Sequence, residues 1–199
     1  MADKYRSFSE LAESERRGRD FRVRRRKRGG DTVIIAPHGG GIEPGTSEIA
    51  DAIAADDLSF YAFEGIKSRG NRDLHITSTR FDEPRCVALV EASTKAISIH
   101  GEDSQRQVVF LGGRDGETLK RLHASLEQRG FCVKRHQSPG LQGRDKANIC
   151  NRARSGVGVQ LELSKGLRRS FFQSLSKNGR RGKTQRFQEF VTAVREVIR

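Results

Sequence analysis

Two histidines and two glutamates stand where the ends of predicted strands would bring them together. His38 and Glu43 flank three glycines in the segment PHGGGIE, directly after the β-branched run TVIIA at 32–36. His100 follows the apolar run AISI at 96–99, and Glu162 lies near the end of an alternating segment. Open α/β sheets hold their ligands in the crevice beyond the carboxyl ends of the strands. These four side chains are therefore candidates for one shared site.

The chemistry of this residue set is that of a catalytic zinc centre. Two histidines and one glutamate form the ligand set of a catalytic zinc ion, which keeps its fourth position for water. A free carboxylate beside that water, here Glu162, is what proton transfer in hydrolysis requires. The three glycines would let the backbone fold tightly enough for His38 and Glu43 to converge. The alternative is that a histidine after a strand is only a hydrogen-bonded loop residue.

Other candidate residues allow a functional and a structural interpretation. His75, in the segment LHITS, either donates to a substrate or makes a structural hydrogen bond. His123 is expected on the exposed side of a helix and His136 in a polar loop, so neither is assigned a function. Gly112–Gly113 could cradle an anion, but a plain turn between a strand and a helix is the simpler interpretation.

Short apolar runs alternate along the chain with segments of helical periodicity. This alternation predicts an α/β sheet with helices on both faces. Strands are predicted at 21–24, 32–36, 58–63, 96–99, 108–111, 131–134 and 157–163. Helices are predicted after an N-cap at Thr46, from Pro84, from Asp115 to a stop at Gly130, and over 185–199.

The composition fits one folded domain over residues 1–199. No run approaches the ~18 apolar residues of a membrane span, and the first residues lack the apolar core of a signal peptide. We therefore expect neither a membrane protein nor an exported one, and a cytoplasmic location. Cys86, Cys132 and Cys150 show no CxxC spacing, so we expect small buried side chains rather than disulfides or a thiolate zinc site.

The formal charge of +13 is concentrated near the beginning of the chain. Nine Arg or Lys lie between Arg16 and Arg28, ending in the unbroken run RRRKR. Such a run could bind nucleic acid. The alternation of Phe21 and Val23 with arginines instead favours a strand with one solvated face, so that residues 1–30 pack on or flank the domain. A non-catalytic module that binds nucleic acid or another polyanion stays open as the less favoured alternative.

Five segments together resemble the phage poly-γ-glutamate hydrolase family. They are APHGGGIEPGTSE at 36–48, LHITSTRFDEP at 74–84, SIHG at 98–101, NICNR at 148–152 and VQLELS at 159–164. The family is similar in fold to zinc carboxypeptidases, which implies a mixed central sheet in a single domain. The resemblance also implies that His38, Glu43 and His100 hold zinc, that Glu162 is the general base, and that the bonds cleaved are γ-glutamyl amides.

The same resemblance suggests residues that bind the substrate. Asn71 and Arg72 lie between Glu43 and His100 in chain order, as does the Asn-Arg pair that binds the substrate carboxylate in carboxypeptidases. Arg152 and Arg168 are further candidates, since each γ-glutamyl unit carries one carboxylate and arginine binds carboxylates through two hydrogen bonds.

The substrate and the setting are less constrained than the chemistry. A zinc amidase that acts on an N-acyl amino acid or a peptidoglycan peptide is the second enzymatic alternative. We expect a monomer without a membrane partner, released by host lysis if it is of phage origin.

Overall fold

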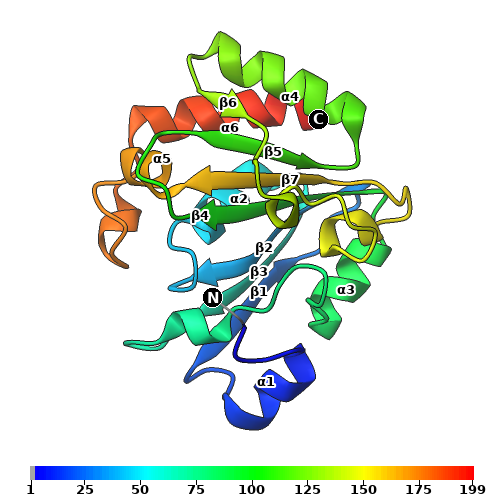
Figure 1. Cartoon of the computed structure of the whole chain (residues 1–199), viewed down its shortest axis with the longest axis vertical. Coiled ribbons are helices and arrows are strands. Elements are labelled where there is room, and N and C mark those ends of the chain that lie inside the picture. The colour runs from blue at the N-terminus through cyan, green and yellow to red at the C-terminus, as the bar shows by residue number, and fades with distance from the viewer. Residues whose placement is uncertain (1–2) are drawn as a thin grey trace.

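Parallel strands form the centre of a seven-stranded mixed sheet in the computed structural model, which describes residues 3–199 (Figure 1). The strands are β1 (Phe21–Arg26), β2 (Thr32–Gly40), β3 (Ser59–Gly65), β4 (Lys95–Glu102), β5 (Val109–Gly113), β6 (Val133–Lys134) and β7 (Val159–Ser164). Their order in the sheet is β1-β3-β2-β4-β7-β5-β6. Strands β3, β2, β4 and β7 run parallel, whereas β1 is antiparallel to β3 and β5 is antiparallel to β7. The predicted α/β fold with a mixed sheet is confirmed.

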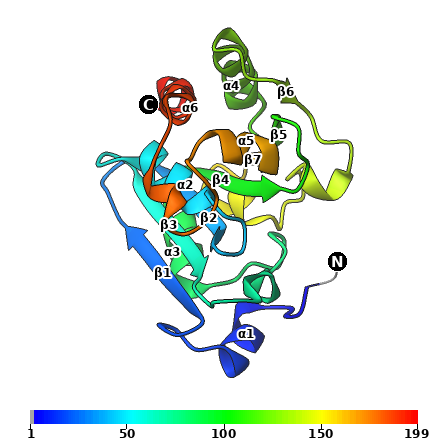
Figure 2. The ribbon, with the colours of Figure 1, turned by 90° about the vertical axis from the view of Figure 1, so that its left-hand side faces the viewer.

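Helices cover both faces of this sheet (Figures 1 and 2). They are α1 (Phe8–Ser14), α2 (Thr46–Ala54), α3 (Pro84–Glu91), α4 (Gly116–Gln128), α5 (Lys165–Ser170) and α6 (Gln185–Ile198). Short 3₁₀ helices lie at Asn71–Leu74, Pro139–Leu141, Ile149–Arg152 and Gly179–Arg181. One apolar cluster joins α2, α4 and α6 to the sheet, and a second joins α1 and α3 to the opposite face. None of the helices within residues 3–199 combines the length and apolar composition that crossing a bilayer requires.

Strand alternation decides which face carries the candidate site. Ile97 and Ile99 of β4 belong to the cluster under α2, α4 and α6. Because successive side chains of a strand point to opposite faces, Ser98 and His100 lie on the other face. Leu161 of β7 is in the first cluster as well, so its neighbour Glu162 shares the face of His100.

Several predictions about local structure were wrong. Helix α2 starts at Thr46 itself, and its N-cap is Gly45 with φ of 101°, a conformation that glycine adopts at little cost. Gly112–Gly113 ends strand β5 instead of forming a turn. A side chain at Gly113 would meet the backbone of Gly158, so glycine lets the two segments lie close together. Cys132 is exposed, since it alternates with two buried neighbours near the sheet edge, whereas the other two cysteines are buried as expected. Helices α1 and α5 had no counterpart in the sequence prediction because they span only seven and six residues.

Much of the basic segment near the beginning of the chain lies in β1, as the strand prediction expected, and three of the four arginines of β1 are paired within the molecule. Arg24 and Arg26 both bind the carboxylate of Asp51 in α2. Arg22 and Arg24 bind Glu64, which lies on the neighbouring strand β3. These arginines therefore attach an edge strand to its neighbours, and the argument that they form an arm for nucleic acid loses its main support.

The Asp51 network predicts a pH-dependent contribution to stability. Partial burial alone would raise the pKa of Asp51, but hydrogen bonds from Arg26 and Arg24 lower it overall. A carboxyl whose pKa is lower in the folded chain stabilises the fold above the unfolded pKa of about 4, and this contribution is lost below it. We expect Asp51→Asn to reduce the free energy of unfolding by about 1 kcal/mol at neutral pH.

Urea unfolding between neutral pH and about pH 3 tests this expectation, because the difference between variant and parent should shrink as Asp51 becomes protonated. Asp56→Asn, at an exposed neighbouring carboxylate outside the network, is the control. A difference that stays constant with pH would contradict the assignment.

Candidate functional site

The residues predicted as metal ligands meet at the carboxyl edge of the parallel strands. His38 lies in β2, His100 lies in β4, and Glu43 lies in the loop between β2 and α2. Nδ1 of His38 is 3.1 Å from Oε1 of Glu43 and 3.2 Å from Nδ1 of His100. The backbone N–H of Gly101 donates to Oε2 of Glu43 at 2.8 Å. The three side chains therefore lie close together, as the sequence analysis expected.

The glycine segment makes this convergence possible, as predicted. A side chain at Gly39 would collide with Ser47 at the start of α2, and Gly40 has a positive φ of 65° against the backbone of β3. The turn closes with a hydrogen bond from the N–H of Glu43 to the carbonyl of His38 at 2.9 Å. Only residues without a Cβ allow the chain to reverse so close to the sheet.

The polar atoms of this cluster need a proton or a cation between them. Nε2 of His38 donates to the carbonyl of Ile76 at 2.8 Å. Burial would lower the pKa of His38, but the carboxylate of Glu43 raises it overall, so Nδ1 can carry a proton toward Glu43. When His38 is neutral, Nδ1 presents a lone pair to Glu43 and His100 instead. Among residues 3–199, the buried Nε2 of His100 has no hydrogen-bond partner. Acceptor atoms that face one another repel unless a positive charge lies between them.

The spacing of these atoms fits a zinc ion. Ligand atoms around tetrahedral zinc lie about 3.3 Å apart, given Zn–N distances near 2.0–2.1 Å. The separations of His38 Nδ1 from Glu43 and from His100 are close to that value. The carbonyl of Ile76 also provides the outer hydrogen bond that fixes the tautomer of a metal-binding histidine.

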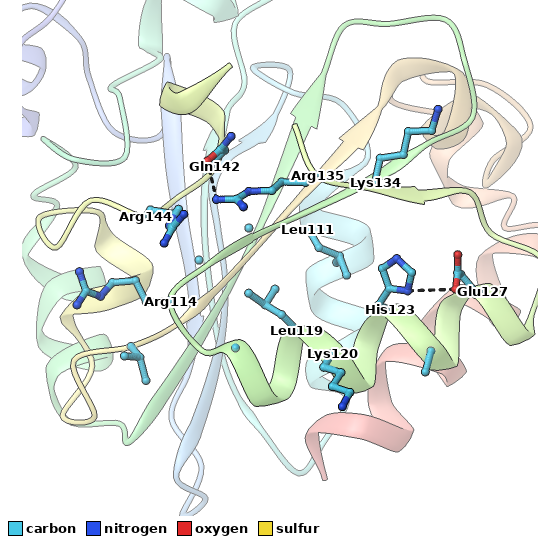
Figure 3. Close-up of a pocket in the computed structure, with 15 residues that line it drawn as sticks. Leu111, Arg114, Leu119, Lys120, His123, Glu127, Lys134, Arg135, Gln142 and Arg144 are labelled. Carbon is cyan, nitrogen blue, oxygen red and sulfur yellow. Dashed lines mark hydrogen bonds and ion pairs between the residues drawn. The ribbon is translucent and has the colours of Figure 1, made fainter. Parts of the chain in front are cut away.

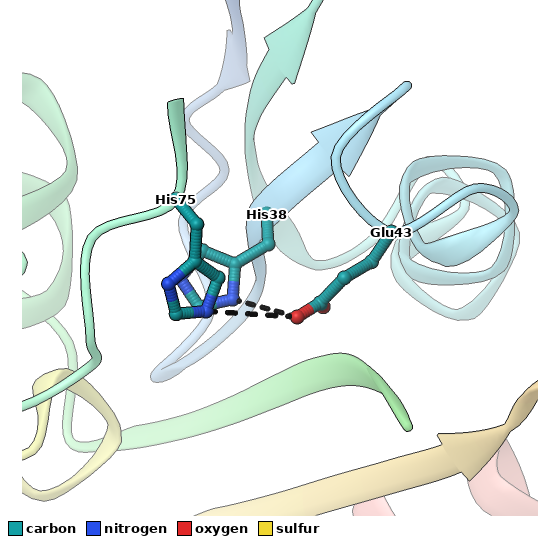
Figure 4. A group of neighbouring side chains, drawn as sticks. All are labelled: His38, Glu43 and His75. Atoms are coloured by element: carbon teal, nitrogen blue, oxygen red, sulfur yellow. Dashed lines mark hydrogen bonds and ion pairs between the residues drawn. The ribbon is translucent and has the colours of Figure 1, made fainter. Parts of the chain in front are cut away.

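His75 joins the same cluster and offers a second possible ligand set (Figure 4). Its Nε2 lies 3.9 Å from Oε1 of Glu43, and its ring centroid is 4.0 Å from that of His38. One ligand atom from each of these three residues can be chosen so that all lie within 4.8 Å of one another. His75 also donates from Nδ1 to Asp3 at 2.6 Å, the structural hydrogen bond that the sequence left open. The two sets share His38 and Glu43 and differ in the third histidine.

Burial and mutual charge set the protonation states at the site. Burial, together with the nearby charge of His38, lowers the pKa of His100 to about 3. Burial would raise the pKa of Glu43, but His38 and the other two histidines lower it to about 2. A neutral imidazole and a carboxylate anion are the forms in which these side chains bind metals.

Glu162 lies beside His100, its register partner across β4 and β7. Its side chain is only 4% exposed, and Oε1 accepts a hydrogen bond from Nε2 of Gln160 at 2.9 Å. Burial and the negative charges of Glu43 and Glu102 raise the pKa of Glu162 well above its ordinary value. A carboxyl with a raised pKa holds a proton more strongly than an ordinary glutamate, which favours it as the group that accepts and returns a proton.

Sequence reasoning missed Gln160, which orients this carboxylate. Its side chain donates to Glu162 and to the carbonyl of Leu141, and it accepts from Asn148 at 2.9 Å. The signal was present in the sequence, because residues two apart on a strand share one face. The amide of Gln160 thus links Glu162 to Leu141 and Asn148 on one face of the sheet.

Two of the predicted substrate-binding arginines border a cleft of about 390 Å³ next to Glu43. Arg72 is 62% exposed and pairs with Asp103. Arg168 is buried, and its guanidinium donates to the carbonyls of Leu163, Pro44 and Glu102. Lys165 also lines the cleft. Sequence analysis missed it, although it directly follows strand β7 at the edge where ligands bind.

Asn71 and Arg152, which were also predicted to bind substrate, make structural contacts, as His75 does through Asp3. Asn71 accepts from the backbone N–H of Lys67 and donates to its carbonyl, so it closes the loop after β3. Arg152 pairs with Glu91 at 2.8 Å, at the end of α3. Their predicted contacts with substrate stay predictions.

Comparison with known proteins identifies the family. Residues 5–193 match the family model described as poly-gamma-glutamate hydrolase. The UPF0714 protein YmaC of Bacillus subtilis (strain 168) is 36% identical over 199 residues, which cover 98% of this chain and 84% of YmaC. The structure of a bacteriophage poly-gamma-glutamate hydrolase matches with a TM-score of 0.94 and 33% identity over 98% of this chain and 96% of that one. A zinc-free structure of YndL matches with a TM-score of 0.92 and 36% identity over 99% and 98%. The chain belongs to the poly-gamma-glutamate hydrolase family.

Proposed function

We propose that this protein is a zinc-dependent hydrolase of γ-glutamyl amide bonds, with His38, Glu43 and His100 as the zinc ligands. The observation that carries the proposal is the convergence of these three side chains beside Glu162 at the carboxyl edge of the sheet. Membership of the poly-gamma-glutamate hydrolase family supports the substrate. The existence of a zinc-free form of YndL supports zinc as the metal.

His100 is the better third ligand on physical grounds. It is buried, its pKa is lowered so that the neutral form dominates, and its Nδ1 lies 3.2 Å from that of His38. His75 is more exposed and is already held by Asp3. We therefore assign His75 to the wall of the site, where its Nε2 faces Glu43 and the entering substrate.

Glu162 supplies the proton transfers of the proposed reaction. Zinc held at such a site supplies a Lewis acid that acidifies water and polarises an amide carbonyl. Glu162 accepts a proton from the attacking water and donates it to the nitrogen of the leaving amine as the C–N bond breaks. Gln160 holds Oε1 of this carboxylate, which leaves Oε2 to carry the proton.

Cationic side chains of the cleft would recognise the carboxylates of the substrate. Arg72, Lys165 and Arg168 line the cleft beside Glu43. Arg168 is engaged by backbone carbonyls, and Arg72 is paired with Asp103. Lys165 has no carboxylate partner among residues 3–199, so its ammonium group is the most available to a γ-glutamyl α-carboxylate. A parallel assay on poly-γ-glutamate, an N-acyl amino acid and a peptidoglycan peptide tests the substrate class.

The ligand set predicts which histidine variants lose zinc. His100→Ala and His38→Ala should each lose zinc and activity, because each removes a ligand from a three-ligand site. His75→Ala should keep zinc, measured as metal per chain by elemental analysis. His123→Ala, on the exposed face of α4, is the matched control. Full zinc in His100→Ala together with its loss in His75→Ala would assign the other ligand set.

The proton-transfer role of Glu162 predicts a loss of rate without a loss of metal. Glu162→Gln keeps the shape of the side chain and the zinc content, but kcat should fall by about 10²–10⁴-fold. Glu13→Gln, an exposed substitution on α1, controls for the change of charge. Activity near that of the parent in a zinc-loaded Glu162→Gln protein would eliminate Glu162 as the base.

Recognition of carboxylates by Lys165 predicts an effect on KM. Replacing the ammonium by an amide removes a charged hydrogen bond, so Lys165→Gln should raise KM for a γ-glutamyl substrate by about tenfold. Lys27→Gln, at an exposed lysine of the loop after β1, serves as the control in the same steady-state assay. An unchanged KM would remove Lys165 from the binding site.

A further inference from the structure

A groove at the other end of the sheet gathers cationic side chains that form no ion pair with any carboxylate of residues 3–199. It has a volume of about 940 Å³ and lies between α4, the β5–β6 edge and the loop that follows β6 (Figure 3). Five exposed cationic side chains line it: Arg114, Lys120, Lys134, Arg135 and Arg144. None of the five forms an ion pair with a carboxylate within residues 3–199. In contrast, Arg22, Arg24 and Arg26 of β1 are paired with Asp51 or Glu64.

The other polar residues of the groove offset only part of this charge. Glu127 is the one carboxylate among the described lining residues, and it lies 3.1 Å from His123, one helical turn away (Figure 3). Five cationic side chains thus face one carboxylate. Arg135 donates to the side-chain oxygen of Gln142, which is neutral. The groove is therefore an attractive site for an anionic ligand, and a ligand with several negative charges would profit most.

The floor of the groove is apolar. Leu111 and Leu119 line it from β5 and α4, and Val157 borders it near the start of β7. A γ-linked glutamate chain has methylene groups in its backbone and one carboxylate on each unit, so it can contact an apolar floor and a cationic rim together. No Phe, Tyr or Trp is among the lining residues, whereas sites for single-stranded nucleic acid use aromatic side chains on which bases stack. The chemistry of the groove thus favours a polycarboxylate over a nucleic acid.

The position of the groove separates it from the catalytic cluster. Strand β5 is antiparallel to β7, and Gly113 in the groove lies opposite Val159 at the beginning of β7. Glu162 lies toward the other end of β7, near His100. Only a ligand long enough to pass around the sheet edge can occupy both places at once.

We propose that this groove binds a second segment of the polymeric substrate, distant from the bond that is cleaved. The identity of the polymer as poly-γ-glutamate rests on the proposed function. Binding in the groove keeps the rest of the chain near the catalytic cleft, so that each further cleavage begins from a high local concentration of substrate. The groove thus selects long polycarboxylate chains, which bridge both sites, over short ones.

Binding by a catalytically inactive protein tests this proposal without interference from hydrolysis. In the Glu162→Gln background, the affinity for long poly-γ-glutamate is measured at several salt concentrations with and without Arg114→Gln, Lys120→Gln and Arg144→Gln. The plot of log K against log salt has a negative slope. By analogy with single-stranded polyanions, removing three contacts should make this slope less steep by about two. Lys120→Gln alone should make the slope less steep by about 0.7, which keeps the test valid if the triple variant folds poorly.

A second triple variant controls for net charge. Arg17→Gln, Arg25→Gln and Lys27→Gln remove the same charge from exposed positions before, within and after β1 that have no ion pairs within residues 3–199. This control should bind the polymer like its parent. Equal losses in both triple variants would overturn the groove in favour of a diffuse effect of charge.

Two further outcomes separate this inference from the proposed function. A groove variant that binds poly-γ-glutamate like its parent, but loses affinity for a single-stranded oligonucleotide of equal charge, would overturn the polycarboxylate assignment. Binding through the groove, with no cleavage of the polymer by the zinc-loaded parent protein, would support this inference and overturn the proposed hydrolysis instead.

Discussion

The structure depends on the close approach of acceptor atoms at a buried edge of the sheet. Nδ1 of His38 lies 3.1 Å from Glu43 and 3.2 Å from Nδ1 of His100, and His100 lies 3.9 Å from Glu43, in a place that water cannot easily screen. Such an arrangement is stable only around a positive charge. The glycine turn after β2, the carbonyl of Ile76 and the N–H of Gly101 all hold the three side chains in it. A proton on His38, whose pKa the carboxylate of Glu43 raises against the effect of burial, or a bound cation can supply this charge.

A second constraint is the placement of one carboxyl beside this cluster without making it a ligand. Glu162 is brought to His100 by strand register and is held by Gln160, which bridges to the carbonyl of Leu141. The following residue, Gln142, lines the cationic groove. One loop therefore contacts both the side chain that orients the proposed base and the groove at the other end of the sheet.

The excess of positive charge is divided among three environments with different consequences. In β1, Arg22, Arg24 and Arg26 bind Asp51 or Glu64 and stabilise the fold. In the cleft, backbone carbonyls and Asp103 hold two of the cations in position. In the groove beside α4 the cations are exposed and unpaired within residues 3–199, so their charge is available to a ligand. A net charge is therefore informative only once the partner of each cation is known.

The sequence by itself determined the strand and helix pattern, the α/β class and the convergence of His38, Glu43 and His100. Each follows from local rules: β-branched runs form buried strands, glycines allow a tight turn, and residues after parallel strands share one edge. The short helices α1 and α5 gave too little periodicity to be seen.

Only the tertiary structure decided which polar side chains have partners. It placed His75 against Glu43 from a separate loop, paired the β1 arginines with carboxylates far along the chain, and left the cations around α4 unpaired within residues 3–199. Contacts between residues so distant in sequence depend on how the whole chain packs, and no local pattern encodes them.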